Sequence, residues 1–461
     1  MKVLFIYKYE FVEPIGILSL SSYLKKEGHD VQFIDLYFCK NYLKEIKLIK
    51  PDVIAYSVTT GRHKFYLKLN NNLKKQFNFF ALFGGPHCTF FPEFIKEKGV
   101  DGICRGEGEL AAAEFLDKLE NNQDIRHIQN IDVKINNKIF QNSLRNKISN
   151  LDSLPFVDRE LTSKYASYRK AHIRYVLAGR GCPYNCTYCF NHSYNKLYAG
   201  KGEVVRKRSV NHVIEELKIV KKRWIPKRFQ FIDDTFILDK KWVLNFCKQY
   251  QKEIKLPFIC YARINLIDDD IIKALRNAGC ITLLFAIESG NEFIRNTILK
   301  RNISEAQTLK AAKLCHKYGI NIFTQNIVGL PDENIENVWE TIKLNIKCRP
   351  SYAWASIFQP YPRTELCDYS IQKGYYLGEV RQIREDYFTS SIMKLKDIRE
   401  IERLHHLFPV AVSYPFLIPF IKILIKLPFN KFYYLIWNSH RAYCYLFKLK
   451  MIDFSELFTK K

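Results

Sequence analysis

Three closely spaced cysteines are the residues of this sequence best suited to chemistry. They lie in Gly181-Cys182-Pro-Tyr-Asn-Cys186-Thr-Tyr-Cys189-Phe190, with the spacing C-x3-C-x2-C, directly after a predicted strand. Three thiolates on one tight loop can hold three irons of a [4Fe–4S] cube and leave the fourth iron open for chemistry. The alternatives are a zinc knuckle, for which His192 is the close fourth ligand, or three unrelated cysteines. The spacing on a βα loop favours the cluster.

A series of strand–helix repeats positions this loop. After residue 171, short apolar runs alternate with amphipathic helical patterns such as 210–222 and 304–318. The predicted strands are 173–178, 228–232, 258–262, 282–287, 322–328 and 352–358. Six such repeats predict a partial or full α/β barrel, in which function lies at the carboxyl ends of the strands.

An earlier α/β region precedes the barrel. Strands are predicted at 3–7, 31–34, 52–57, 79–83 and 101–104, with helices such as 17–26 and 109–119 between them. This alternation predicts a parallel doubly wound sheet. Its strand ends carry Ser57-Val-Thr-Thr60, Gly84-Gly-Pro-His87 and Arg105-Gly-Glu-Gly108. Residues 125–170 are polar, and we expect few strands there.

Composition limits the classes of protein. The chain has 461 residues, 47% hydrophobic and 26% charged, which excludes a mainly disordered protein. Its net charge of +25 is compatible with an acidic partner or with biased coding of lysine and asparagine. The amino terminus lacks a signal-peptide pattern, and 13 cysteines without a repeating framework fit a reducing compartment. We therefore expect a cytoplasmic protein, with a peripheral position at the inner membrane surface as an alternative.

The cysteine motif resembles that of the radical S-adenosylmethionine (SAM) superfamily, with the aromatic Tyr188 before the last cysteine. The resemblance implies that SAM binds the open iron and is cleaved to methionine and a 5′-deoxyadenosyl radical. It also implies that Asp233 or Asp234 replaces the usual Gly-Gly-Glu at the SAM amino group. By the same resemblance, Glu288 meets the ribose, while Ile327 and Gly329 contact the adenine through the backbone.

The amino-terminal region is similar to the cobalamin-binding domain of many radical SAM enzymes. The resemblance implies that Ser57, Thr59, Thr60, Gly84, Gly85, Gly106 and Glu107 line the cobalamin. One departure is the loop from Tyr7 to Gly16, which lacks the D-x-H-x-x-G histidine that ligates cobalt in other cobalamin domains. Either cobalamin binds without an imidazole or the domain has lost it, and the retained glycine turns favour binding.

Together, pattern and resemblance predict an α/β fold with four parts. These are a Rossmann-like cobalamin-binding domain (1–145), a linker (146–170), a (β/α)6 partial TIM barrel (171–370) and a small, mostly helical extension (371–461). The predicted function is a cobalamin-dependent radical SAM methyltransferase acting on an unactivated carbon. The alternatives are a radical oxidation, cyclisation or rearrangement with cobalamin in another role or absent, or a non-enzymatic basic module that binds cobalamin or nucleic acid.

Partners follow from this reading. We expect a small-molecule substrate, with an apolar one as an option, and an external electron donor of flavodoxin or ferredoxin type. We expect no nucleic acid, and no catalytic side chain is identified. Residues 407–450 contain six Lys or Arg, no acidic residue and many aromatics, and four prolines argue against a long straight helix. This segment either lies on an anionic membrane surface or caps the barrel as a third small core.

Overall fold

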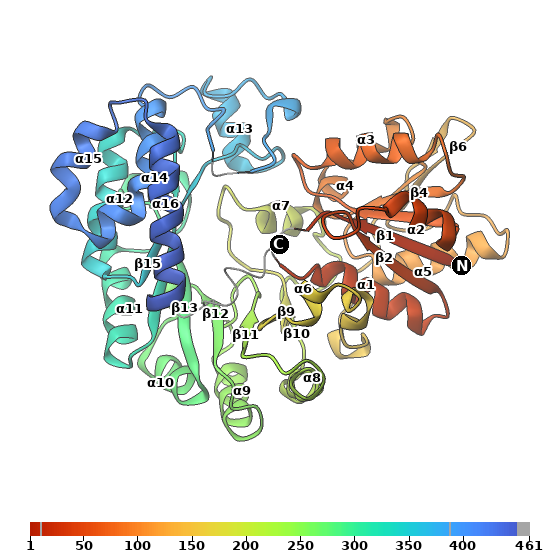
Figure 1. Ribbon diagram of the computed structural model, residues 1–461, viewed down its shortest axis with the longest axis horizontal. Coiled ribbons are helices and arrows are strands. Elements are labelled where there is room, and N and C mark those ends of the chain that lie inside the picture. Colours follow the sequence, from red (N-terminus) through yellow and green to blue (C-terminus); the bar gives the residue numbers. More distant parts are fainter. Residues whose placement is uncertain (10–11, 387–388, 450–461) are drawn as a thin grey trace. The chain divides into compact units, whose positions relative to one another are not determined.

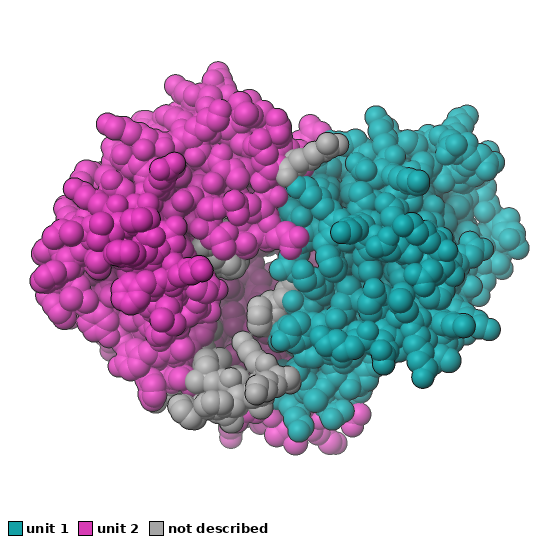
Figure 2. Space-filling view, turned by 45° about the horizontal axis from the view of Figure 1, so that its top comes forward, with its two compact units in different colours: residues 1–171, 197–206 teal, residues 172–196, 207–461 magenta. Residues whose placement is uncertain are grey.

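The computed structural model describes residues 1–9, 12–386 and 389–449. The chain forms two compact units (Figure 2). Unit 1 comprises residues 1–171 and 197–206, and unit 2 comprises residues 172–196 and 207–461. Each unit is built on its own sheet.

Unit 1 contains a seven-stranded sheet in the order β2-β1-β3-β4-β5-β6-β7. The strands are β1 (Lys2–Tyr7), β2 (Asp30–Asp35), β3 (Val53–Ser57), β4 (Phe80–Gly84), β5 (Gly102–Cys104), β6 (Ile131–Ile135) and β7 (Lys138–Phe140). The helices are α1 (Ile15–Lys26), α2 (Tyr42–Ile49), α3 (His63–Leu73), α4 (Pro86–Phe90), α5 (Glu109–Glu120) and α6 (Ala166–Arg169). Strands β1 to β5 pair in parallel, which confirms the doubly wound sheet. Ligands of such sheets bind at the carboxyl ends of the strands.

The antiparallel hairpin of β6 and β7 extends this sheet. In the described structure, residues 125–170 thus contain only these two short strands, in keeping with the expectation of few, although the polar pattern did not mark the hairpin. Asn136 and Asn137 form the turn with φ angles of 48° and 63°, the left-handed conformation that two-residue hairpins require. Asparagine tolerates this conformation better than most residues, so the Asn-Asn pair was the available signal.

Residues 146–170, which we expected to be a linker, pack within unit 1. The Arg159 guanidinium lies 2.7 Å from the Glu13 carboxylate, and both side chains are buried. The Tyr168 hydroxyl donates a 2.7 Å hydrogen bond to Asp35 at the end of β2. These contacts tie the segment to the loop after β1 and to the end of β2.

Unit 2 contains a six-stranded sheet in the order β15-β14-β13-β12-β11-β8, with all strands parallel. The strands are β8 (Ile173–Val176), β11 (Arg228–Phe231), β12 (Phe258–Ala262), β13 (Cys280–Glu288), β14 (Asn321–Val328) and β15 (Tyr352–Ile357), besides the two-residue β9 (Gly179–Arg180) and β10 (Arg206–Lys207). The helices that follow them are α7 (Phe190–Leu197), α8 (Val210–Trp224), α9 (Lys240–Glu253), α10 (Asp269–Ala278), α11 (Glu305–Lys317), α12 (Ile335–Cys348) and α13 (Glu365–Gln372). This is the predicted (β/α)6 partial barrel (Figure 1).

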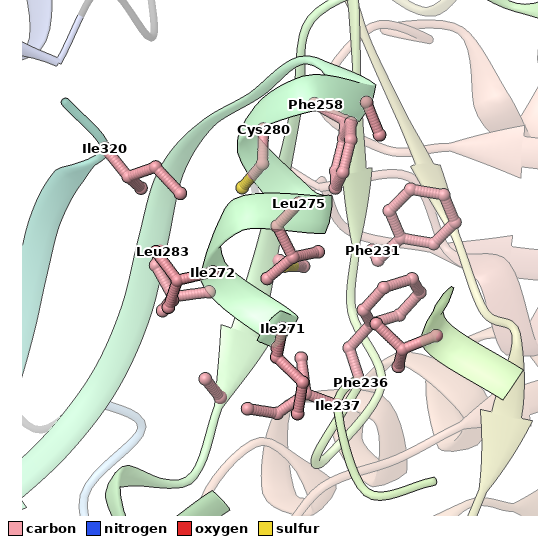
Figure 3. Close-up of a cluster of buried hydrophobic side chains, with 14 of the residues drawn as sticks. Phe231, Phe236, Ile237, Phe258, Ile271, Ile272, Leu275, Cys280, Leu283 and Ile320 are labelled. Carbon is pink, nitrogen blue, oxygen red and sulfur yellow. The ribbon is translucent and has the colours of Figure 1, made fainter. Parts of the chain in front are cut away.

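The core of unit 2 lies between the sheet and its outer helices. Figure 3 shows Phe231 and Phe258 from the strands facing Ile272 and Leu275 of α10, and all four are buried. The apolar positions of α10 recur at helical spacing, so one face of the helix covers the sheet while the other meets solvent. This packing fixes the strands and so the loops at their carboxyl ends.

The carboxyl-terminal extension is helical, with α14 (Ile398–Ser413), α15 (Ile418–Leu424) and α16 (Asn430–Tyr443). Pro409 lies inside α14 and does not end it, but the segment as a whole is divided into three helices, as the four prolines predicted. Pro415 and Pro419 begin new helical turns, where the missing N–H costs nothing. No helix in the described ranges combines the length and apolar character needed to cross a membrane.

The aromatic residues of the extension divide into two groups. Phe408, Tyr433 and Trp437 are buried, and Phe408 and Tyr433 pack with residues of β15 and α12 in one apolar cluster. This part of the extension caps the barrel, as one of our two alternatives predicted. Phe416 and Phe420 instead remain 72% and 64% exposed. Capping therefore explains only some of the aromatic residues.

Candidate active site at the strand ends

The cysteine loop lies between β8 and α7 of unit 2. Cys186 is buried, while Cys182 and Cys189 are partly exposed. Thr187 anchors the loop, because its hydroxyl donates a 2.7 Å hydrogen bond to the Ile298 carbonyl. The Asn195 side chain on α7 donates to the Cys182 carbonyl at 2.8 Å. Burial raises the pKa of the Cys189 thiol to about 12, and nearby Cys186 and Cys182 also raise it, so the three sulfurs are electrostatically coupled.

A single-ion site is not assembled at this loop. Among the residues that the structure describes, no three His, Cys, Asp or Glu side chains are grouped to hold one metal ion. His192, our candidate fourth zinc ligand, has other partners. Its Nδ1 lies 3.0 Å from the Asn185 side-chain oxygen, and its Nε2 lies 3.5 Å from Glu365. A [4Fe–4S] cluster does not require the three sulfurs to meet at one ion, since each thiolate binds its own iron.

The two aspartates after β11 have different environments. Asp233 is buried and accepts the Ala178 N–H at 3.0 Å. Burial raises the pKa of Asp233 to about 6. Asp234 is exposed, yet surrounding protein raises the pKa of its carboxyl by desolvation, against a hydrogen bond from Asn191. Its charge also acts on Cys182 and Cys189, so Asp234 is the aspartate beside the cysteine loop.

Glu288 ends β13 in a constrained backbone. Its φ angle is 65°, and the register with β14 shifts between Ala286 and Glu288. Such irregularities turn a side chain out of the regular strand pattern and are frequent beside active sites. The Tyr188 hydroxyl, from the cysteine loop, donates to Glu288 at 2.7 Å. The structure therefore brings together two of the residues predicted for SAM.

The other two lie at the end of β14, with Ile327 in the strand and Gly329 directly after it. Tyr188 and Ile327 pack in the same apolar cluster. The N–H groups of Gly329 and Leu330 donate to Glu333 at 2.6 and 3.1 Å, and Gly329 has a φ angle of 76°. Burial raises the pKa of Glu333 to about 8, and its second carboxyl oxygen makes no hydrogen bond in the described structure. Glu333 thus fixes the turn that we expected to meet adenine.

Two buried arginines, which our sequence reasoning missed, border the cysteine loop. Arg263 directs an N–H to the Cys186 sulfur at 3.6 Å and stacks on the Tyr184 ring at 3.7 Å. Arg301 directs an N–H to the same sulfur at 3.8 Å and donates to the Tyr188 hydroxyl at 3.2 Å. A charged residue directly after β12 was the only signal for Arg263, and nothing in the local pattern marked Arg301.

The strand ends of unit 1 carry our cobalamin candidates. After β3, Ser57 and Thr59 are exposed, whereas Thr60 is buried and pairs with His87 Nδ1 at 3.1 Å. A Cβ on Gly84 would make only ordinary contacts at 3.8 Å or more. A Cβ on Gly85 would lie 2.8 Å from the Val58 nitrogen. The protein itself therefore needs glycine at 85, whereas a Cβ at 84 would pack against Cys104 and Tyr56 without strain.

The turn with Gly106 and Glu107 has different partners. Tyr198 is buried, and its hydroxyl would lie 1.7 Å from a Cβ on Gly106. The Glu107 carboxylate pairs with Arg206 at 2.6 Å and accepts the Ile148 N–H at 2.9 Å. Gly106 and Glu107 thus pack against residues 197–206. The residues before and after this segment belong to unit 2. Their own contacts within unit 1 account for both residues.

The loop after β1, where other cobalamin domains carry a histidine, is held by tyrosine and carboxylate. The Tyr9 N–H donates to Asp35 at 3.3 Å, and the Tyr9 ring packs edge-on against Tyr168 at 5.5 Å. Glu10 and Phe11 lie outside the described residues. The sequence of this loop contains no histidine.

Comparison with known proteins gives the family. Residues 176–344 match the family model described as radical SAM superfamily, and residues 1–116 match the B12 binding domain. The chain is 32% identical over 427 residues to a protein of Pyrococcus horikoshii named uncharacterized methyltransferase PH0819, covering 90% of this chain and 89% of that protein. The chain belongs to the B12-binding radical SAM enzymes.

More distant similarity extends to other reactions and to solved structures. An anaerobic magnesium-protoporphyrin IX monomethyl ester cyclase of Synechocystis is 27% identical, covering 82% of this chain and 76% of that protein. The radical SAM methyltransferase TsrM of Kitasatospora setae, solved with cobalamin and a [4Fe–4S] cluster, superimposes with a TM-score of 0.67 at 15% identity, covering 81% of this chain and 75% of that chain. This likeness shows the shared fold.

This B12-binding radical SAM enzyme uses a [4Fe–4S] cluster, SAM and cobalamin. The side chains described above are compatible with binding these three cofactors. Cys182, Cys186 and Cys189 are the three thiols that could hold the cluster, and two guanidinium groups lie beside the buried one. Unit 2 places Asp234, Glu288 and the Gly329 turn at the ends of β11, β13 and β14. Unit 1 offers the exposed hydroxyls of Ser57 and Thr59 at the end of β3.

Proposed function

We propose that this enzyme is a methyltransferase that acts on an unactivated carbon of a small molecule. The observation that carries the proposal is the set of side chains in unit 2 around the cysteine loop, where Tyr188 links Glu288 to that loop. The names of PH0819 and TsrM, both methyltransferases, support the reaction class. When bound, the cluster and SAM supply a 5′-deoxyadenosyl radical, and cobalamin supplies a methyl carrier.

The protein's own residues would perform defined tasks in this reaction. Asp234 is exposed and lies next to the cysteine loop. Its carboxylate would accept a charge-assisted hydrogen bond from the SAM amino group. Glu288 would accept from the ribose hydroxyls, held in place by Tyr188. The turn at Ile327 and Gly329 would present its backbone to adenine, kept in shape by Glu333. Asp233 would act only on the fold, because it is buried against Ala178.

For cobalamin we propose a reduced set of contacts. Ser57 and Thr59 would line the group, and the backbone at Gly84 would approach it closely. Thr60, Gly85, Gly106 and Glu107 would shape the site indirectly, through His87, Val58, Tyr198 and Arg206. Cobalt would carry no imidazole from the Tyr7–Gly16 loop, whose sequence contains none.

One experiment separates methyl transfer from the alternatives. Anaerobically reconstituted protein, given cobalamin, a reductant and SAM with a deuterated methyl group, should form 5′-deoxyadenosine and S-adenosylhomocysteine. An extract of the host lacking this gene should then gain a product with the labelled methyl group. 5′-Deoxyadenosine without S-adenosylhomocysteine would favour radical oxidation or cyclisation, a class represented by the cyclase of Synechocystis. Neither product would favour a non-enzymatic binding module.

We further propose a reduced cytoplasmic setting with an external flavodoxin or ferredoxin as electron donor. All thirteen cysteines are free thiols in the structure, as expected in a reducing compartment. The radical reaction consumes electrons that the chain does not store. Reduction by purified flavodoxin with its reductase should support SAM cleavage, whereas chemical reductant as the sole effective donor would count against this partner.

Exposed apolar side chains on the carboxyl-terminal helices support a second proposal, peripheral contact with an anionic membrane. Around α15, Phe416, Phe420, Ile423 and Leu427 are exposed. Phe420 and Ile423 lie three residues apart on one side of α15, and Phe416 and Leu427 flank this helix in the turns before and after it. Ile421 and Ile425, on another side, are buried in the cluster with α14 and β15. The exposed side chains therefore contribute little to the described fold.

Helix α16 repeats this arrangement. Phe432, Leu435 and Tyr443 are exposed, whereas Tyr433, Trp437 and His440 are buried on the inner side. Around the exposed residues stand Lys422, Lys426, Lys431 and Arg441, and residues 407–449 contain no acidic side chain. Each basic residue near an anionic surface contributes about 1 kcal/mol, and aromatic rings favour the interface. This charge selects an anionic bilayer as partner. Lys450, the last residue of the predicted segment, lies outside the described residues.

Vesicle sedimentation tests this contact in the full chain. Wild type should pellet with vesicles containing phosphatidylglycerol and be released by high salt. The double change Phe420→Ser and Ile423→Ser should weaken vesicle binding about 30-fold, because each apolar side chain contributes roughly 1 kcal/mol when buried. Leu48→Ser on α2, also a 72% exposed apolar residue, is the matched control. If wild type is a dimer and the double change makes it monomeric without reducing vesicle binding, a second copy of the chain covers these apolar side chains instead of a membrane.

A further inference from the structure

Arg263 and Arg301 surround the most buried of the three cysteines. Each arginine is 6% exposed, and Cys186 is 5% exposed. The two guanidinium groups approach the Cys186 sulfur from different parts of the chain, one after β12 and one between β13 and α11. Both are anchored by carbonyl oxygens, since Arg301 donates to Ala286 at 2.6 Å and Arg263 donates to the Arg301 carbonyl.

Two permanent positive charges at one sulfur have an electrostatic consequence. Arginine remains protonated in proteins, and charges interact strongly where water is excluded. A thiolate that accepts N–H groups and faces positive charge loses electron density, and hydrogen bonds to sulfur help to set the potential of an iron–sulfur cluster. The other two cysteines have no arginine partner among the described contacts, since Cys182 contacts Thr235 at 4.0 Å.

We propose that Arg263 and Arg301 are positioning residues that raise the reduction potential of the cluster through Cys186. This inference rests on the proposed function, because it assumes that the three thiolates hold a [4Fe–4S] cluster. Reduction adds one negative charge to the cluster, and the buried guanidinium groups stabilise that charge. The effect lets an electron donor of ordinary potential reduce a cluster whose Cys186 corner is shielded from water.

The two arginines make different contacts besides the shared one to Cys186. Arg301 contacts both Cys186 and Tyr188, so it links the cluster ligand to the carboxylate of Glu288. Arg263 contacts Cys186 and stacks on Tyr184, within the cysteine loop itself. Loss of Arg301 should therefore alter both the cluster potential and the SAM site, while loss of Arg263 should alter mainly the potential.

Redox titration of the reconstituted cluster, followed by electron paramagnetic resonance without SAM or substrate, tests the proposal. Arg263→Gln keeps a hydrogen-bond donor and removes the charge, whereas Arg263→Lys keeps the charge. The Gln variant should need a lower potential, with the ratio of reduced to oxidised cluster falling about tenfold at fixed potential, which is 59 mV for one electron. The Lys variant should stay near wild type. Arg174→Gln is the control, because this buried arginine stacks on Trp224.

The outcomes are distinct. A full cluster with an unchanged potential in both Arg263→Gln and Arg301→Gln would overturn the inference while leaving the proposed function intact. Weaker SAM binding at unchanged potential would likewise overturn it, since the arginines would then serve the SAM carboxylate. Failure of the wild-type protein to form any cluster would instead overturn the proposed function. If Arg301→Gln does not fold, the Arg263 pair alone decides.

Discussion

The carboxyl ends of the two parallel sheets hold their polar side chains in different ways. In unit 2, these residues bind one another, since Tyr188 donates to Glu288 and the Gly329 turn donates to Glu333. In unit 1, Ser57 and Thr59 extend into solvent at the end of β3. A site whose groups are fixed in advance loses little entropy on binding. The unit 2 groups are thus held in place by the protein itself, whereas the unit 1 hydroxyls of Ser57 and Thr59 are exposed.

Replacing a cluster cysteine should give the largest difference between the two units, with loss of the cluster in unit 2 and retained cobalamin binding in unit 1. Cys186→Ala removes one of three thiolates, so the reconstituted protein should lose its iron–sulfur absorption and all SAM cleavage. Cobalamin uptake by unit 1 should persist, because its candidate contacts lie in another sheet. Visible spectroscopy and iron analysis measure both properties. Cys247→Ala, a buried cysteine of the core, is the control, and a full cluster in Cys186→Ala would refute the assignment.

Replacing the two adjacent aspartates, Asp233 and Asp234, should give different effects of the next largest size. Asp234→Asn should weaken SAM binding by about 10- to 100-fold, because a charge-assisted hydrogen bond contributes roughly 1.5–3 kcal/mol. Asp233→Asn should leave SAM affinity near wild type and lower thermal stability, since Asp233 bonds the Ala178 N–H. Isothermal titration of the reconstituted protein measures the first and calorimetry the second. The reverse pattern would place Asp233 at SAM.

The two glycines after β4 test unit 1 in the same way. Gly84→Ala should fold normally, because its Cβ meets nothing closer than 3.8 Å, and should bind cobalamin about tenfold more weakly if corrin approaches the backbone there. Gly85→Ala should destabilise unit 1 by roughly 1–3 kcal/mol, since its φ angle is 89° and its Cβ would press on Val58. Equal cobalamin affinity in wild type and Gly84→Ala would remove Gly84 from the site.

The last prediction is a pH dependence of stability from Glu333. Burial raises the pKa of this carboxyl from its ordinary value of 4.5 to about 8, so the folded state holds a proton that the unfolded state has released. Stability should therefore fall by about 1.4 kcal/mol per pH unit as the pH rises between these two values. Glu333→Gln keeps an acceptor for the Gly329 N–H and should remove this slope. Thermal unfolding from pH 5 to 8 measures it, and parallel slopes in both proteins would contradict the assignment.

Most of the architecture was predictable because apolar periodicity marks buried strands well. The predicted strand 282–287 lies within β13, and 228–232 overlaps β11. The missed hairpin of β6 and β7 has only five and three residues, too short for periodicity to stand out in a polar segment. Its signal was the turn, where Asn136 and Asn137 accept a left-handed backbone.

The site was predictable only where chemistry and spacing coincide. The cysteine loop met both conditions. The choice between Asp233 and Asp234 could not be made from the sequence, since neighbouring residues at a strand end point in opposite directions and the end of β11 sets which one is buried. Arg301 contacts Cys186 across 115 residues, and Glu107 contacts Arg206 across 99. Such partners are set by tertiary packing, which local pattern does not contain.

The segment 197–206 has a consequence for how the protein is made. Tyr198 fills the space beside Gly106, and Arg206 neutralises Glu107, so the amino-terminal unit is complete only after residue 206 has left the ribosome. At about 5–20 residues per second, the 35 residues between 171 and 206 add several seconds of synthesis. During that delay the nascent chain lacks the Tyr198 ring beside Gly106 and the Arg206 guanidinium beside Glu107. A gene fragment cut at residue 171 would make this temporary state permanent.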